Sequence, residues 1–209
     1  MSVTTQSAAT TKRGGKRASN RASNRDAILM AARHVFAEQG FGGTTVRDII
    51  RRTELASGTF YNYFDSKEAV FEALSVEIGE DLRAKLSEAR ARATDFESFI
   101  EGSYLTYFSY YADNPLDHAL MRSNRGRQGE NSNMQGPQVK AGLAEMREDI
   151  ERAMAAGMVG DIDPAYLTAA IGGIAFAILD EMMKSATPDP RAAAQFAARL
   201  ILTGMQGKT

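Results

Sequence analysis

Hydroxyl, amide and phenol side chains gather on one short stretch in the first third of the chain. Ser57, Thr59, Asn62 and Tyr63 all lie between positions 57 and 63. The spacing of Phe60 and Phe64 predicts a short helix that turns its apolar face inward and leaves the polar side chains pointing elsewhere. Side chains of these types hydrogen-bond to the phosphates and base edges of nucleic acids. The stretch therefore suits nucleic-acid binding.

The residue types that perform most enzyme chemistry are scarce. The chain has no cysteine, which excludes disulfides and thiolate metal sites, and its two histidines are His34 and His118. No glycine-rich phosphate loop or serine, histidine and acid set is evident, so an enzyme is the less favoured class and no cofactor or metal is expected. The simpler interpretation of His34 is an exposed or partly packed side chain.

Two short helices joined by a tight turn are predicted between Thr44 and Glu68. Val46, Ile49 and Ile50 recur at helical spacing. Thr45 precedes them, and its hydroxyl can cap the first helix while Asp48 favours its positive end. The chain then bends near residues 54–55 before the second helix. A long third helix is predicted to start directly afterwards, because Asp65 or Ser66 can cap a helix there. Apolar residues then recur every four positions, so this helix could extend to about position 92, a length of roughly 40 Å at the usual rise per residue.

This stretch resembles the helix-turn-helix of the TetR family of transcriptional regulators, whose pattern runs roughly T-x-x-x-I-A-x-x-A-G-V-S-x-G-T-x-Y-x-Y-F-x-x-K-E. The residues that match it at unbroken spacing are Thr45, Ile49, Gly58, Thr59, Tyr61, Tyr63, Phe64, Lys67 and Glu68. Glu54 replaces the usual turn glycine, so the bend needs no positive φ or is strained. Ala56 replaces the usual capping hydroxyl, so Ser57 is expected to take over the cap.

The resemblance implies an all-α protein of about nine helices. Residues 23–70 would form a three-helix DNA-binding domain, and the long helix would join it to a ligand-binding and dimerisation domain over residues 71–209. Residues 1–22 read as a disordered tail, and residues 1–25 hold six basic side chains and no acidic one. Residues 1–74 carry a formal charge of +4 and the remainder −5, so the basic end is the expected polyanion-binding end. Whether the tail itself contacts DNA stays open.

The resemblance also assigns roles within the predicted DNA-binding domain. The candidates for base or groove contact are Arg47, Ser57, Gly58, Thr59 and Tyr61. The candidates for phosphate contact are Thr45, Asn62, Tyr63 and Lys67. The alternative for Tyr61 is packing within the small domain, and the alternative for Lys67 is an ordinary solvated lysine at a helix start.

Aromatic residues are concentrated between Phe96 and Tyr111, where seven of the chain's seventeen lie. Four tyrosines in eight residues cannot all share one buried face, so a cavity that binds an apolar or aromatic effector is one interpretation and core packing is the other. The cavity is expected between the long helix, the aromatic helix and the helices near positions 139–156 and 164–186. The candidate lining residues are Phe99, Tyr104, Tyr107, Phe108, Tyr111, His118, Met121 and Phe176.

The last two helices, at about 164–186 and 190–205, are rich in alanine and glycine, and the first is apolar nearly all round. A helix that is apolar on every side is buried on every side, which predicts a homodimer surface; the alternative is that they are the innermost helices of a monomer.

The hypothesis is a cytoplasmic repressor that binds a palindromic double-stranded operator as a homodimer and is released by a small molecule. An architectural DNA-binding protein without an effector is the alternative, and no membrane-spanning run is expected.

Overall fold

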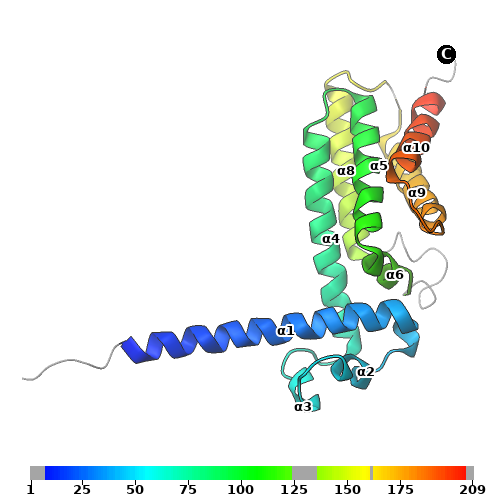
Figure 1. The fold of residues 1–209 in the computed structure, drawn as a ribbon. Coiled ribbons are helices and arrows are strands. Elements are labelled where there is room, and N and C mark those ends of the chain that lie inside the picture. The colour runs from blue at the N-terminus through cyan, green and yellow to red at the C-terminus, as the bar shows by residue number, and fades with distance from the viewer. Residues whose placement is uncertain (1–7, 124–135, 161, 206–209) are drawn as a thin grey trace, which may run out of the picture. The chain divides into compact units, whose positions relative to one another are not determined.

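The computed structural model describes residues 8–123, 136–160 and 162–205, and these residues form nine helices and no strand (Figure 1). The all-α class is therefore confirmed. The chain divides into two compact units, Met1–Leu74 and Ser75–Thr209.

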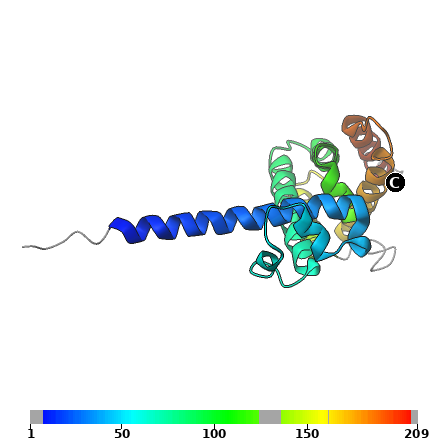
Figure 2. The same cartoon turned by 60° about the horizontal axis from the view of Figure 1, so that its bottom comes forward.

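The first unit is built on α1 (Ala8–Gly43), with α2 (Val46–Arg51) and α3 (Ser57–Phe60) beside its C-terminal part (Figures 1 and 2). The apolar stripe of α1 is buried, and Val35 and Phe36 have no exposed surface. Three rings meet here: the centroids of Phe36, Phe41 and Phe71 lie 5.1–5.7 Å apart. Ile49 of α2 and Phe60 of α3 also have no exposed surface, so both short helices contribute to the core of this unit.

Helix α1 differs from the expectation at its start. It begins at Ala8, so residues 8–22, which the sequence predicts to be disordered, continue the helix toward the N-terminus; residues 1–7 lie outside the described part of the chain. Gly40 breaks the helix near its end, because this residue has φ 72°. The hydroxyl of Thr44 donates to the Gly40 carbonyl at 2.8 Å and secures the bend.

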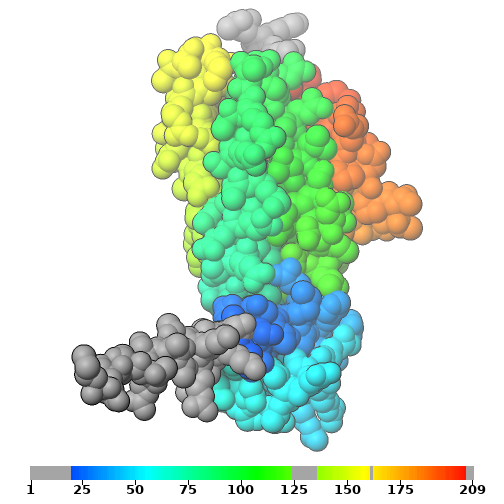
Figure 3. All heavy atoms as spheres, turned by 60° about the vertical axis from the view of Figure 1, so that its left-hand side comes forward, coloured from blue at the N-terminus to red at the C-terminus, as the bar shows by residue number. Residues whose placement is uncertain are grey.

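The second unit contains most of α4 (Lys67–Ala91), whose first turns belong to the first unit. Figure 3 shows α4 with α8 on one side and α5 on the other. The remaining helices of this unit are α5 (Phe96–Asp113), α6 (Pro115–Ser123), α8 (Pro137–Ala155), α9 (Pro164–Met182) and α10 (Pro190–Met205). Asp95 caps α5 with its carboxylate 2.7 Å from the Ser98 N–H, as its position in the sequence predicts.

Helices α9 and α10 leave apolar side chains on the surface. Tyr166 is 78% exposed, and Phe196 and Leu200 are each about half exposed. By length and composition α9 could cross a membrane, with a mean hydropathy of 1.4, although its wholly apolar run, from about Ala169 to Leu179, is short. Its other side packs against α5, α8 and α10. One side of this helix pair is therefore core and the other is an uncovered apolar face.

Candidate nucleic-acid interface and ligand pocket

Helix α2 begins with the predicted cap. The Asp48 N–H donates to the Thr45 hydroxyl at 3.2 Å, and the Thr45 N–H donates back to the Asp48 carboxylate at 3.0 Å. The hydrogen bonds from the Thr45 hydroxyl and backbone lower the pKa of Asp48. Arg47 is exposed immediately beyond this cap, so its guanidinium is available to a partner.

The turn between α2 and α3 is closed by a side chain rather than by a glycine. The Thr53 hydroxyl donates to the Ile50 carbonyl at 2.9 Å and accepts from the Leu55 N–H at 3.2 Å. The expected cap by Ser57 is wrong: Ala56 is the N-cap and makes no side-chain bond, because Ser57 already lies inside the helix.

Helix α3 presents most of its predicted contact groups to solvent. Ser57 and Gly58 are exposed, whereas Thr59 is half-buried. Tyr61 is 62% exposed, and its ring meets the buried Phe60 ring edge-on at 5.3 Å. Tyr61 therefore packs at one end only, and the rest of its ring remains available.

Asn62 and Tyr63 share an open hollow of about 460 Å³ with three residues of α1. The Asn24 amide donates to the Tyr63 hydroxyl at 3.2 Å, and Asn20 and Arg21 complete the lining. The sequence assigned no contact role to these α1 residues. The excess of basic over acidic residues up to position 25 was a signal for a contact with DNA in this segment. Because the segment was expected to be disordered, the sequence did not predict that these α1 residues lie on a helix.

Lys67 is occupied within the protein. Its ammonium donates to the carbonyls of Phe41 at 2.9 Å and Thr44 at 2.7 Å, and lies 4.7 Å from the centre of the Phe41 ring. A cation at the start of a helix is unfavourable by itself, and these carbonyls supply the compensating negative ends of dipoles. Lys67 thus fastens the end of α1 to the start of α4, and its phosphate contact stays a prediction.

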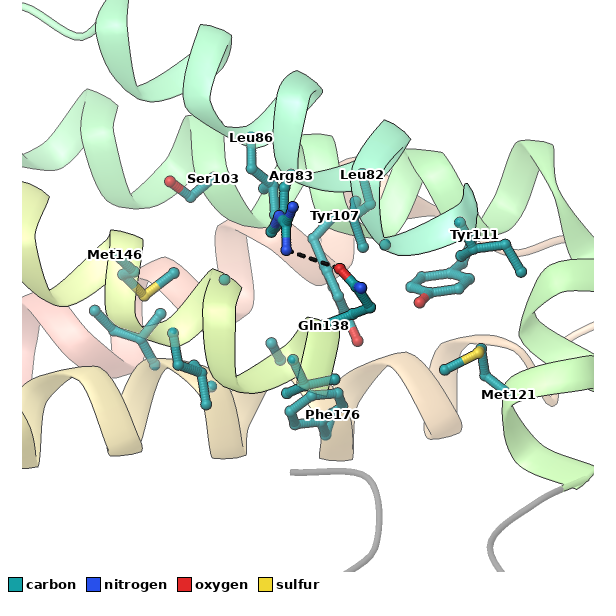
Figure 4. Close-up of a pocket in the computed structure, with 18 of the residues that line it drawn as sticks. Leu82, Arg83, Leu86, Ser103, Tyr107, Tyr111, Met121, Gln138, Met146 and Phe176 are labelled. Carbon is teal, nitrogen blue, oxygen red and sulfur yellow. Dashed lines mark hydrogen bonds between the residues drawn. The ribbon is translucent and has the colours of Figure 1, made fainter. Parts of the chain in front are cut away.

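The second unit contains a partly open apolar cavity of about 110 Å³ between α4, α5, α8 and α9, with Met121 of α6 at one end (Figure 4). Tyr107 and Phe176 meet edge-on at 6.1 Å on its wall. Arg83 of α4 and Gln138 of α8 face each other across it, and the guanidinium donates to the amide oxygen at 2.7 Å. The cavity lies between the four helices named from the sequence.

Five of the eight predicted lining residues lie on this cavity and three do not. Those on the wall are Tyr104, Tyr107, Tyr111, Met121 and Phe176. Phe108 is wholly buried, and Phe99 is buried and stacked on Phe96 at 5.7 Å, so both belong to the core. His118 is buried behind Tyr111, with Nε2 3.5 Å from an Asp180 oxygen.

The residues that sequence reasoning missed come mainly from α4 and α8. Ile78, Leu82, Val139 and Met146 belong to apolar stripes that read as ordinary core, yet they line the cavity. Periodicity identifies the inward face of a helix but does not show where that face borders a space.

Comparisons with known proteins bear on the first unit most directly. Residues 28–74 match the model of the family described as bacterial regulatory proteins, tetR family. The repressor KstR2 of Rhodococcus jostii is 33% identical over 90 residues, which cover 43% of this chain and 44% of that protein. The regulator UidR of Escherichia coli K12 is 36% identical over 64 residues, which cover 31% and 33%. Residues 28–74 are therefore similar to the helix-turn-helix of the tetR family.

Solved structures extend the likeness to the whole fold. The fatty acid degradation regulator FadR of Bacillus halodurans superposes with a TM-score of 0.71 at 23% identity, covering 88% of this chain and 97% of that one. A tetR-family regulatory protein from Rhodococcus RHA1 gives 0.71 at 22% identity, covering 87% and 96%. In sequence, the chain spans less than half the length of the curated relatives it matches.

Replacing Gly58 by alanine is expected to weaken DNA binding without harming the fold of the first unit. No atom lies within 4 Å of a Cβ built at Gly58, and alanine favours a helix over glycine. If α3 enters a groove, the added methyl is compressed against DNA, which costs about 1–3 kcal/mol, or about five- to 150-fold in affinity. Titration of labelled operator DNA with the protein measures this loss of affinity. Gly102→Ala, equally uncrowded but in the second unit, is the control and should bind as the wild type does.

Replacing Lys67 by methionine is expected to destabilise the first unit. The methionine keeps the apolar stem but leaves the Phe41 and Thr44 carbonyls without their donor, at a cost of about 1–3 kcal/mol in the free energy of unfolding. Urea unfolding followed by circular dichroism measures this loss. Lys85→Met removes an exposed lysine bonded to Asp81, which is expected to cost only about 0.3–0.5 kcal/mol; equal losses in the two variants would contradict the role of Lys67.

The stability of the second unit is expected to fall above about pH 10 because of Tyr104. Its hydroxyl donates to the Ile171 carbonyl at 3.1 Å, and burial raises the pKa of Tyr104. Above the unfolded pKa of about 10 the unfolded chain loses a proton that the folded one retains, so stability drops by up to about 1.4 kcal/mol per pH unit. Tyr104→Phe should remove this slope in urea unfolding across alkaline pH, whereas Tyr166→Phe, at an exposed site, should preserve it.

Proposed function

We propose that the protein is a transcriptional regulator that reads a specific operator through α3 and the start of α2. The observation that carries the proposal is the first unit itself: a capped α2, a turn closed by Thr53, and an α3 whose Ser57, Gly58 and neighbouring Tyr61 are exposed. Arg47 supplies a planar fork suited to guanine. The hollow around Tyr63 and Arg21 supplies hydroxyl, amide and guanidinium donors for a phosphate beside the groove.

We infer that the active form is a homodimer that buries the uncovered apolar face of α9 and α10. Tyr166, Phe196 and Leu200 are all large, apolar and exposed in the single chain. A second copy is the partner expected for such a face, because a two-fold interface is self-complementary. Two copies of α3 related by this symmetry would read a palindromic operator.

We further propose that a small molecule in the cavity releases the DNA. Helix α4 is continuous from Lys67, which holds the first unit together, to Leu82 and Arg83 on the cavity wall. A ligand that binds better when α4 is displaced shifts the population toward conformers with the wrong spacing of the two α3 helices. Repression is favoured over activation because the relatives KstR2 and DhaR are both named repressors.

Footprinting of the purified protein on the DNA that flanks its own coding region tests the proposal. The expected result is that the wild-type protein protects one roughly palindromic site. The Thr59→Ala variant should not protect this site, and addition of a cavity ligand to the wild-type protein should abolish the protection. A protein that protects all sequences equally, with a loss that depends only on salt, would instead be an architectural DNA-binding protein. Sedimentation of the same sample should give a dimer, and Phe196→Glu should shift it toward monomer.

A further inference from the structure

We propose that the cavity takes a compact aromatic monocarboxylate and that Arg83 is the residue that selects its charge. Apart from this guanidinium, the wall is formed by uncharged residues, most of them apolar or aromatic. An apolar space with a single cation on its wall suits a ligand that is apolar along its body and anionic at one end. The inference names the ligand class of the pocket in the proposed function and rests on it for the effect on DNA.

Gln138 occupies the position that the ligand's carboxylate would take. Its amide oxygen accepts from Arg83 at 2.7 Å, while the carboxylate of Glu145 lies 3.5 Å from the Arg83 Nε. A neutral amide uses one donor of a guanidinium that can bind a carboxylate through two parallel N–H groups. When the ligand's carboxylate replaces the Gln138 amide, Arg83 therefore exchanges one hydrogen bond to a neutral acceptor for two hydrogen bonds to a charged acceptor.

The size of the space indicates a single ring. The cavity of about 110 Å³ is smaller than the ~150 Å³ apolar cavity that takes up benzene. Gln138 adds the missing room when it leaves, because its side chain extends into the cavity (Figure 4). It lies over Gly79, where a Cβ would come within 2.6 Å of its own Cβ, so α8 approaches α4 closely at this point. The rings of Tyr107, Tyr111 and Phe176 would surround the ligand's ring edge-on.

Calorimetric titration of the DNA-free full-length protein with phenylacetate and phenylacetamide tests the inference. The two compounds have nearly the same shape, and only phenylacetate is ionised at neutral pH. The acid is expected to bind about tenfold more tightly than the amide, since hydrogen bonds to charged groups are the stronger ones. Arg83→Met should abolish this preference, Gln138→Ala should strengthen binding of the acid, and Lys85→Met, on the same helix but exposed, should change neither Kd.

Equal affinity for the two compounds, no binding of either, or a preference for the acid that survives Arg83→Met would each overturn the inference. Circular dichroism checks that the variants fold, and Arg83→Gln replaces Arg83→Met if that variant is unfolded. Phenylacetate is then added to the protein bound to its operator. If it binds but the complex persists, the release mechanism of the proposed function fails while the assignment of Arg83 stands.

Discussion

Replacing Arg47 by alanine is expected to reduce operator affinity from about thirtyfold to more than ten-thousandfold. A bidentate arginine contact to a guanine contributes about 1–3 kcal/mol of discrimination, and a dimer loses two such contacts, or about 2–6 kcal/mol. The loss should be specific: affinity for unrelated DNA should fall by far less. Fluorescence anisotropy with operator and scrambled duplexes at one salt concentration measures both.

The folded state should tolerate this change because the Arg47 side chain is exposed on the second residue of α2 and the cap is made by Thr45 and Asp48. Arg92→Ala removes the same charge from an exposed site in the second unit and should leave both affinities unchanged. If Arg47→Ala and Arg92→Ala weakened binding equally, or if Arg47→Ala weakened both duplexes equally, Arg47 would contribute only charge rather than base reading.

Replacing Arg90 by leucine is expected to cost the second unit about 3 kcal/mol of its free energy of unfolding. The Arg90 side chain is 4% exposed, and its Nε donates to the Asp149 carboxylate, which links the last turn of α4 to α8. Breaking a buried pair costs about 3–5 kcal/mol because one charge is left without its partner. The lower end applies here because Arg152 also donates to Asp149.

Scanning calorimetry should show this loss as a Tm lower by roughly 6–12 °C. Arg92→Leu is the control two residues further on: its side chain is 70% exposed and pairs with Glu88, so the expected cost is at most about 0.5 kcal/mol. A stability equal to the wild type in Arg90→Leu would show that leucine packing replaces the pair.

Local signals explain why the helix-turn-helix could be predicted from the sequence. The Thr45–Asp48 cap joins residues three positions apart, and Phe60 and Phe64 are both buried as their spacing predicts, although α3 itself ends at Phe60. The structural consequences of the two departures from the family pattern were harder to predict. Glu54 stands where the pattern has a turn glycine, and the Thr53 side chain closes the turn instead; at Ala56, α3 has no side-chain cap.

Long-range contacts explain what the sequence did not reveal. Lys67 bonds to a carbonyl 26 positions away, and Arg83 meets Gln138 across 55 positions. Within α5 the aromatic density indicated a cavity, but only the fold separates Tyr107 on its wall from Phe108 in the core. Neighbouring residues on one helix differ in direction by about 100°, so composition alone could not assign them.

Selection of bound fragments from a random-sequence DNA library by the full-length protein tests whether α3 reads a specific DNA sequence, and it assumes no operator. We expect enrichment of one motif with two inverted half-sites, since two copies of α3 related by a two-fold axis must read the same bases in opposite directions. The motif should not be enriched by Arg47→Ala. Recovery of unenriched sequence, with retention that falls uniformly as salt rises, would contradict sequence-specific reading by α3.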